Sequence, residues 1–332
     1  MADRHQGRGG HRKLGPEGAE GVALELPRVG LGTAPLGNLF SAVPESEARA
    51  LVERAWTAGI RLFDTAPLYG YGLAERRLGA LLSAQPRDSF LLSTKVGRLV
   101  RPRARPEPGD FVIADHVGPV WDFSYEGARR SLEESLDRLR LNRVDIALIH
   151  DPDDHHAEAL GGAYRALHEL REQGVVRAIG AGMNQAEALA RFAREGDFDV
   201  FLVAGRHTLL EQPALPELLP LCVERGIQVM VGGVFNSGLL AGGATYNYRP
   251  APARLLERAQ ALEATCARHG VPLKAAALQF PYGHPAVASV LLGCRSVAQL
   301  EENLALLAHP VPPGLWSELK AEGLLGAEVP TP

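Results

Sequence analysis

The stretch SYEGARRSLEESLDRLRLNRVDIALIH, residues 124–150, contains the local pattern on which the fold prediction rests. Ser124 is a residue type that often caps the N-terminus of a helix. The apolar residues behind it recur at helical spacing and fall on one face: Ala128, Leu132, Leu136 and Leu139. The run VDIALIH (144–150) has the length and the β-branched, apolar composition of a buried strand. The stretch therefore predicts a helix followed by a strand.

The same alternation extends in both directions along the chain. Strand-like runs occur at residues 29–34, 60–66, 89–96, 144–150, 175–183, 200–205, 228–235 and 289–293, with helix-like segments between them. This alternation predicts an α/β fold, a (β/α)8 TIM barrel with a parallel eight-stranded sheet. A doubly wound open sheet is the alternative, but the first strand-to-helix turn, GLGTAPLGN, lacks the GxGxxG pattern of that fold.

Two segments depart from this alternation. Residues 1–26 are rich in glycine and charge, and we expect a disordered N-terminal tail there, followed by a single barrel domain at residues 27–325. Residues 98–123 are rich in proline, arginine and glycine and form a long connection between a strand and a helix. Long connections on such barrels usually shape a site, although a disordered surface insertion has the same composition.

The composition argues against several classes of protein. The net charge of -4 gives no general attraction to nucleic acid or to an anionic membrane. No run is apolar and long enough to span a membrane, and the N-terminus lacks the apolar core of a signal peptide. The three scattered cysteines show no metal-binding spacing and are typical of reduced thiols. We therefore expect a cytoplasmic protein without a metal site, and the sequence indicates no oligomeric state.

Polar residues stand at the ends of several predicted strands, where the strands of a βα barrel converge on one site. Asp64, Lys95, His150 and Asn184 end or follow four of the apolar runs, and Tyr69 lies on the loop after Asp64. Singly, such residues also fit a buried ion pair, a core histidine or a loop aromatic. Their arrival together at successive strand ends predicts a catalytic centre.

The types of these residues fit proton and hydride transfer. A tyrosine titrates near ~10 and is a poor base at neutral pH. A nearby ammonium favours the phenolate, so we expect Lys95 to lower the pKa of Tyr69 while Asp64 keeps Lys95 charged and oriented. His150 can hydrogen-bond the reacting oxygen and fix the substrate.

Three segments resemble the aldo-keto reductase family: FDTAPLYGYGLAERRLG (63–79), STK (93–95) and SLEESLDRLRLNRVDIALIHDPD (131–153). The resemblance runs from about Pro27 to Leu304. It implies a catalytic tetrad at Asp64, Tyr69, Lys95 and His150, with the tyrosine as general acid–base and nicotinamide exchanging a hydride with a carbonyl carbon.

HDPDD (150–154) and AGRHTLLEQ (204–212) resemble one branch of that family, which contains L-fucose and D-threo-aldose 1-dehydrogenases and, close by, pyridoxal 4-dehydrogenase. This implies oxidation of a cyclic hemiacetal to a lactone. A general NAD(P)H-dependent aldehyde or ketone reductase is an alternative. The non-enzymatic alternative is a nucleotide-sensing binding protein, similar to the aldo-keto reductase-like β subunits of potassium channels.

The resemblance further implies that NAD or NADP lies across the barrel mouth. The matching cofactor positions are Gly32, Thr33, Asp64, Asn184, Ser237, Gly238, Leu239, Gly293, Arg295, Ser296, Gln299 and Asn303. The family's stacking aromatic and its carboxamide-binding glutamine correspond here to Gly232 and Ala204. The lysine and arginine of NADP-preferring members correspond to Gly293 and Gln299, which favours NAD, although Arg295 can replace the missing charge.

The expected partner is a small sugar or aldehyde. Tyr69 and His150 belong to its binding site by the resemblance. Trp121 and Asp122 end the long connection, where the ring can cover an apolar sugar face and the carboxylate can accept from a hydroxyl. The alternatives are that Trp121 anchors the loop and that Asp122 caps the helix beginning near Ser124.

Overall fold

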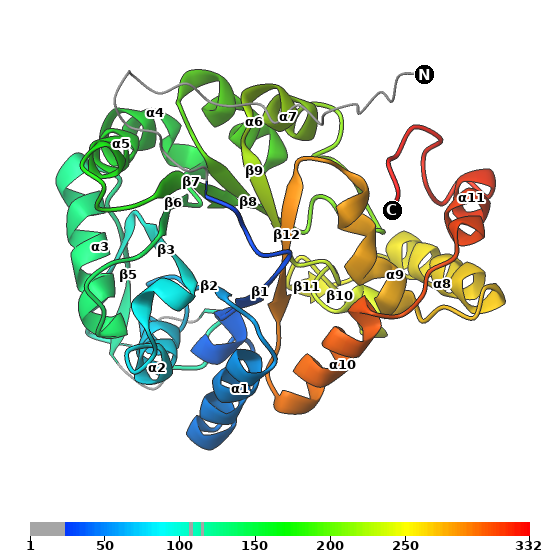
Figure 1. Ribbon diagram of the computed structural model, residues 1–332, viewed down its shortest axis with the longest axis horizontal. Coiled ribbons are helices and arrows are strands. Elements are labelled where there is room, and N and C mark those ends of the chain that lie inside the picture. The colour runs from blue at the N-terminus through cyan, green and yellow to red at the C-terminus, as the bar shows by residue number, and fades with distance from the viewer. Residues whose placement is uncertain (1–23, 106–108, 114–115) are drawn as a thin grey trace, which may run out of the picture.

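A computed structural model describes residues 24–105, 109–113 and 116–332, and it confirms the predicted barrel (Figure 1). Eight parallel strands close in the order β1-β12-β9-β8-β7-β6-β3-β2. Their bounds are β1 Val29–Gly32, β2 Leu62–Asp64, β3 Leu91–Val96, β6 Ile146–His150, β7 Ala178–Met183, β8 Val200–Ala204, β9 Gln228–Gly232 and β12 Val287–Gly293. Each strand lies within or overlaps one of the eight predicted runs.

Helices surround the barrel in Figure 1, and most of them connect consecutive strands. The α-helices are α1 Glu45–Thr57, α2 Leu73–Leu82, α3 Tyr125–Leu139, α4 His156–Glu158, α5 Arg165–Glu172, α6 Ala186–Glu195, α7 Leu218–Arg225, α8 Ala253–Arg268, α9 Leu273–Gln279, α10 Val297–Leu307 and α11 Pro313–Ala321. Short 3-10 segments are η1 Ala34–Gly37, η2 Arg87–Ser89, η3 Asp153–His155, η5 Leu239–Ala241 and η6 Phe280–Gly283, and η4 Ala159–Tyr164 is a π-helix. In the described part of the chain, no helix combines the length and apolar character needed to cross a membrane.

The decisive stretch folds as its pattern predicts. The Ser124 side chain accepts a hydrogen bond from the Gly127 amide at the start of α3. Ala128, Leu132 and Leu139 are buried against the barrel, which accounts for the helical spacing of the apolar residues. All five residues of β6 are buried, because helices cover one face of the sheet and the barrel core fills the other.

The barrel interior is apolar, and the chain ahead of β1 closes it. The side chains of Leu24 and Leu26 are buried in one cluster with interior residues of the strands, namely Leu62, Ile146, Leu148, Val200, Leu202, Met230 and Leu291. The Leu24 carbonyl also accepts a hydrogen bond from Gln228 Nε2 at 2.6 Å. Residues 24–26 of the predicted tail are therefore part of the barrel, and the rest of that prediction lies outside the described residues.

The long connection after β3 contains an antiparallel hairpin of β4 Arg98–Pro102 and β5 Val117–Trp121. Arg98 pairs with Trp121 at the end of the hairpin that joins β3 and α3. A second hairpin, β10 Thr245–Tyr246 with β11 Arg249–Pro250, follows β9. Its neighbour Tyr248 contacts Phe40 from the β1 loop, with ring centroids 5.5 Å apart. Both hairpins are connections from the carboxyl ends of barrel strands, the end at which the polar residues gather.

Candidate active site

Lys95 is the centre of the polar cluster at the barrel mouth. It stands near the carboxyl end of β3, and only 1% of the residue is exposed. Its Nζ donates to Asp64 Oδ2 at 2.7 Å, to the Thr65 carbonyl at 2.9 Å and to the Tyr69 hydroxyl at 3.1 Å. The ammonium thus has three acceptors, as many as it has protons to donate. This geometry fixes the Tyr69 hydroxyl beside a permanent positive charge.

Burial is the largest influence on the ionisation of this cluster. It raises the pKa of the Asp64 carboxyl against the opposing effect of Lys95. It also raises the pKa of Tyr69 to about 12, although Lys95 favours the phenolate. Burial acts to lower the pKa of Lys95, but Asp64 and Tyr69 outweigh it and the net pKa is raised. Lys95 is therefore charged at neutral pH, and Tyr69 keeps its proton. The expected net lowering of the Tyr69 pKa is wrong, because desolvation exceeds the effect of the ammonium.

His150 ends β6 beside Tyr69, with the two rings edge-to-face and their centroids 5.8 Å apart. Burial lowers its pKa well below the ordinary value, and the positive charges of Arg98 and Lys95 act in the same direction. The imidazole is therefore neutral at physiological pH. His150 Nδ1 is buried without a hydrogen-bond partner among the described residues. A neutral imidazole next to a protonated tyrosine provides two hydrogen-bonding groups for one substrate oxygen.

The residues around this centre include some that sequence reasoning missed. Asp151 Oδ2 lies 3.5 Å from His150 Nε2 and accepts a hydrogen bond from Arg98 at 2.8 Å. The Phe111 ring packs near Tyr69, with centroids 6.1 Å apart. Strand-end reasoning could have included Asp151, which directly follows His150. No periodic signal marks Arg98 or Phe111, since both lie in the irregular connection after β3.

Trp121 and Asp122, at the end of that connection, lie in different surroundings. Trp121 is 49% exposed, and the Arg98 guanidinium lies 5.5 Å from the centre of its ring. Asp122 Oδ1 accepts hydrogen bonds from the Ser124 amide and hydroxyl at 3.2 and 2.5 Å. Asp122 is thus bound to Ser124, the residue that caps α3, and does not cap the helix itself, while Trp121 presents an open ring near the mouth.

The predicted cofactor positions lie at or after the carboxyl ends of β1, β2, β7, β9 and β12. Gly32 is paired with both Asp64 and Gly293 in the barrel register. Asn184 follows β7 and is half-buried. Ser296 caps α10 by accepting from the Gln299 amide at 3.2 Å.

Several of these positions are bound within the chain. Thr33 is fully buried, and its hydroxyl donates to the Asp64 carbonyl at 2.9 Å. Asn303 is buried, and its amide donates to Cys294 Sγ at 3.3 Å. The Arg295 guanidinium contacts Ser41 Oγ and the Leu39 carbonyl of the β1 loop. These side chains hold the site together as much as they offer groups to a ligand.

The loop after β9 has a backbone suited to phosphate. Asn236, Ser237 and Gly238 have successive positive φ angles of 48°, 58° and 99°. The Gly238 and Leu239 amides donate to Phe235 and Asn236 carbonyls at 3.0 and 3.3 Å, so these two amides are already bound within the loop. The Ser237 amide has no hydrogen-bond partner among the described residues. The residues here fit an anionic group.

The floor of the mouth is built from small residues. Gly232 and Ala204 are register partners at the ends of β9 and β8. A Cβ added to Gly232 would meet only Leu202 Cδ2, at 3.8 Å. The position that corresponds to the family's aromatic is therefore uncrowded around its Cβ.

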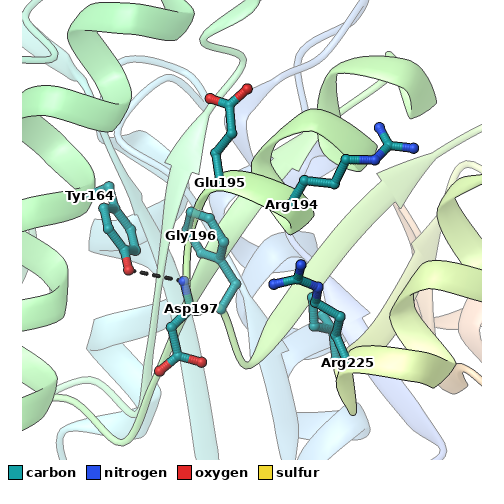
Figure 2. Close-up of a pocket in the computed structure, with 8 residues that line it drawn as sticks. Tyr164, Arg194, Glu195, Gly196, Asp197 and Arg225 are labelled. Carbon is teal, nitrogen blue, oxygen red and sulfur yellow. Dashed lines mark hydrogen bonds between the residues drawn. The ribbon is translucent and has the colours of Figure 1, made fainter.

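A separate hollow of about 340 Å³ lies at the other end of the barrel. Its lining residues surround the loop that leads into β8. In this loop, the Asp197 amide donates to the Tyr164 hydroxyl at 2.9 Å (Figure 2). Arg194 and Arg225, from the last turns of α6 and α7, form its other side in Figure 2. It lies at the amino ends of the strands and contains none of the predicted site residues, so it is not the catalytic site.

A half-buried, lysine-paired tyrosine beside a neutral histidine at the mouth of a parallel barrel defines an acid–base site of an oxidoreductase. Residues 28–321 match the family model Aldo/keto reductase family, and the chain belongs to this family. The protein is accordingly an NAD(P)-dependent oxidoreductase.

Individual relatives agree with this membership. The chain is 46% identical over 326 residues to D-threo-aldose 1-dehydrogenase of Pseudomonas sp, covering 95% of this chain and 98% of the relative. It is 39% identical over 341 residues to pyridoxal 4-dehydrogenase of Microbacterium luteolum, covering 95% and 99%. Among solved structures, the holo form of an aldo-keto reductase from Bacillus halodurans superposes with a TM-score of 0.71 at 25% identity, covering 93% of this chain and 96% of that one.

Proposed function

We propose that this enzyme oxidises C1 of an aldose of the D-threo or L-fucose type, passing a hydride to NAD(P) and forming the lactone. The observation that carries the proposal is the position of the Tyr69 hydroxyl, 3.1 Å from Lys95 Nζ and beside the neutral His150. The 46% identity to a D-threo-aldose 1-dehydrogenase supports an aldose as the substrate.

The four residues divide the chemistry between them. In oxidation, the Tyr69 phenolate takes the proton of the C1 hydroxyl, and Lys95 stabilises that phenolate. His150 holds the same oxygen, and Asp64 keeps Lys95 charged and in place. When bound, an oxidised nicotinamide accepts the hydride from C1. In the reverse direction, protonated Tyr69 donates to the carbonyl oxygen, which suits its raised pKa of about 12.

The dinucleotide site we propose extends from Asn184 across the small-residue floor at Gly232 to the loop around Ser237. Its far end lies at the start of α10, where Ser296 and Gln299 are placed. NAD is favoured over NADP, because Gly293 and Gln299 carry no charge and the Arg295 guanidinium is already bound to the β1 loop. We further expect a small-molecule partner, as the resemblance to the family implies, and a cytoplasmic location.

Steady-state assays with a panel of aldoses, pyridoxal and simple aldehydes, each with NAD and NADP, test this function. We expect the highest kcat/KM for an aldose of the L-fucose type with NAD. If a simple aldehyde is handled as efficiently as every aldose and pyridoxal, the enzyme is a general reductase. If cofactor binds but no substrate turns over, the binding-protein alternative replaces both.

A further inference from the structure

The barrel mouth contains an acidic side chain that the proposed chemistry does not use. Asp151 directly follows β6, and its amide donates to the Gly182 carbonyl at 3.0 Å, which fixes the strand end. Its φ of 40° is in the left-handed region. That region is unfavourable for a residue other than glycine. The fold therefore holds this carboxylate at the mouth in a conformation that a relaxed loop would avoid.

The Asp151 carboxylate is held on one side and open on the other. Arg98 Nη2 donates to Oδ2 at 2.8 Å from the base of the β4–β5 hairpin. No described residue donates to Oδ1, and 29% of the side chain is exposed. One oxygen is thus anchored by a guanidinium, while the other can accept from a ligand. A carboxylate accepts hydrogen bonds only, so the complementary ligand group is a donor such as a hydroxyl.

The position of this carboxylate relative to His150 indicates which hydroxyl it meets. Oδ2 lies 3.5 Å from His150 Nε2, too far for a good hydrogen bond, so Nε2 remains able to contact a ligand beside the carboxylate. Neighbouring oxygens on a sugar are separated by about 3 Å, similar to a hydrogen-bond distance. An oxygen on the reacting carbon that is bound to Tyr69 and His150 would place the next oxygen of the sugar beside Asp151.

We propose that Asp151, oriented by Arg98, accepts a hydrogen bond from the hydroxyl on the carbon next to the reacting one. The preferred substrate class is then 2-hydroxyaldehydes and aldoses with a free 2-hydroxyl, rather than their 2-deoxy counterparts. The choice of reacting carbon rests on the proposed function, but the recognition of a neighbouring hydroxyl applies to both directions of the reaction.

Two substrate pairs that differ only in this hydroxyl test the inference. The first is L-fucose against 2-deoxy-L-fucose in oxidation, and the second is glyceraldehyde against 2-deoxyglyceraldehyde (3-hydroxypropanal) in reduction. Loss of a hydrogen bond to a charged group corresponds to roughly 10- to 100-fold in kcat/KM. We expect wild-type enzyme to prefer the 2-hydroxylated member of each pair by about this factor.

Variants then assign the preference to Asp151. Asp151→Gly removes the carboxylate and suits the positive φ, and Asp151→Asn keeps its shape without the charge. Both should raise KM for the hydroxylated substrate and bring the two members within a few-fold, with little change for the deoxy substrate. The matched control is Glu134→Gln. Glu134 lies on α3 and forms a 2.8 Å ion pair with Arg101 of the same hairpin, and its side chain is equally 29% exposed, so this variant removes a comparable carboxylate charge at a different place.

The outcomes separate this inference from the proposed function. A preference that is lost in both Asp151 variants and kept in Glu134→Gln supports the inference. Equal efficiencies in wild type, or a preference unchanged in Asp151→Gly, would overturn it while leaving aldose oxidation intact. If no aldose is oxidised but the glyceraldehyde preference depends on Asp151, the inference stands and the proposed function fails.

Discussion

Replacing Lys95 by methionine should shift the pH dependence of oxidation upward and slow the reaction at neutral pH. Lys95 Nζ lies 3.1 Å from the Tyr69 hydroxyl. At an effective dielectric constant of about 20, an ammonium and a phenolate at that distance attract by about 5 kcal/mol. Asp64, 2.7 Å from the same ammonium, cancels part of this attraction. A net loss of about 2 kcal/mol raises the pKa of Tyr69 by about 1.5 and lowers the phenolate fraction roughly 30-fold below that pKa.

The assay is a pH–rate profile of aldose oxidation for wild type and variant. Rate rises with pH as Tyr69 loses its proton, so a higher pKa moves this rise to higher pH. Lys95→Met alone leaves the buried Asp64 carboxylate unpaired, which costs about 3–5 kcal/mol of stability. The double variant Asp64→Asn/Lys95→Met removes that problem and is measured alongside, with circular dichroism to establish folding. A folded variant whose rate rises over the same pH range as wild type refutes the coupling between Lys95 and Tyr69.

Three further predictions concern single residues. Tyr69→Phe should lower turnover by at least about 100-fold while a fluorescence titration finds cofactor affinity unchanged, and turnover near the wild-type rate would remove Tyr69 as the acid–base. Trp121→Ala should raise KM for the sugar more than it changes cofactor Kd, and an unchanged KM would place the ring outside the substrate site. Gly79→Ala puts a Cβ 2.3 Å from the Leu139 carbonyl oxygen, where α2 meets α3. It should lower the free energy of unfolding in urea by about 1–3 kcal/mol, whereas Gly161→Ala, with no atom within 4 Å, should change it by less than about 0.5 kcal/mol.

The eight barrel strands could be predicted because each is buried on both faces and therefore reads as a continuous apolar run. Their ends were less predictable, since backbone geometry ends a strand without a change in composition. The run at 228–235 stops as β9 at Gly232, because Gly233 turns the chain with a φ of 64°. Leu24 and Leu26 were assigned to the tail because two leucines among charged residues and glycines show no period, yet they fill the barrel interior.

The meeting of Asp64, Lys95 and His150 follows from strand ends alone, since the carboxyl ends of barrel strands face one mouth. The direction of the Tyr69 pKa shift could not be predicted from the strand ends, because it depends on how much solvent the loop excludes. The β4–β5 hairpin also could not be predicted from the sequence. The stretch between its paired residues Arg98 and Trp121 lacks the apolar alternation that indicates strands. Asp151 was not among the predicted site residues, although it directly follows a strand end, and its contact with Arg98 of the irregular connection could not be predicted from the sequence.

The most direct test of the central claim follows one hydrogen atom. Wild-type protein is incubated with NAD and L-fucose carrying deuterium at C1, and the nucleotide and sugar products are analysed by mass spectrometry. We predict that deuterium appears on the reduced nicotinamide in equal amount to L-fuconolactone, and that both products are lost in Tyr69→Phe. Absence of deuterium from the nucleotide, in protein that reduces a simple aldehyde at normal rate, would contradict oxidation at C1 of the aldose.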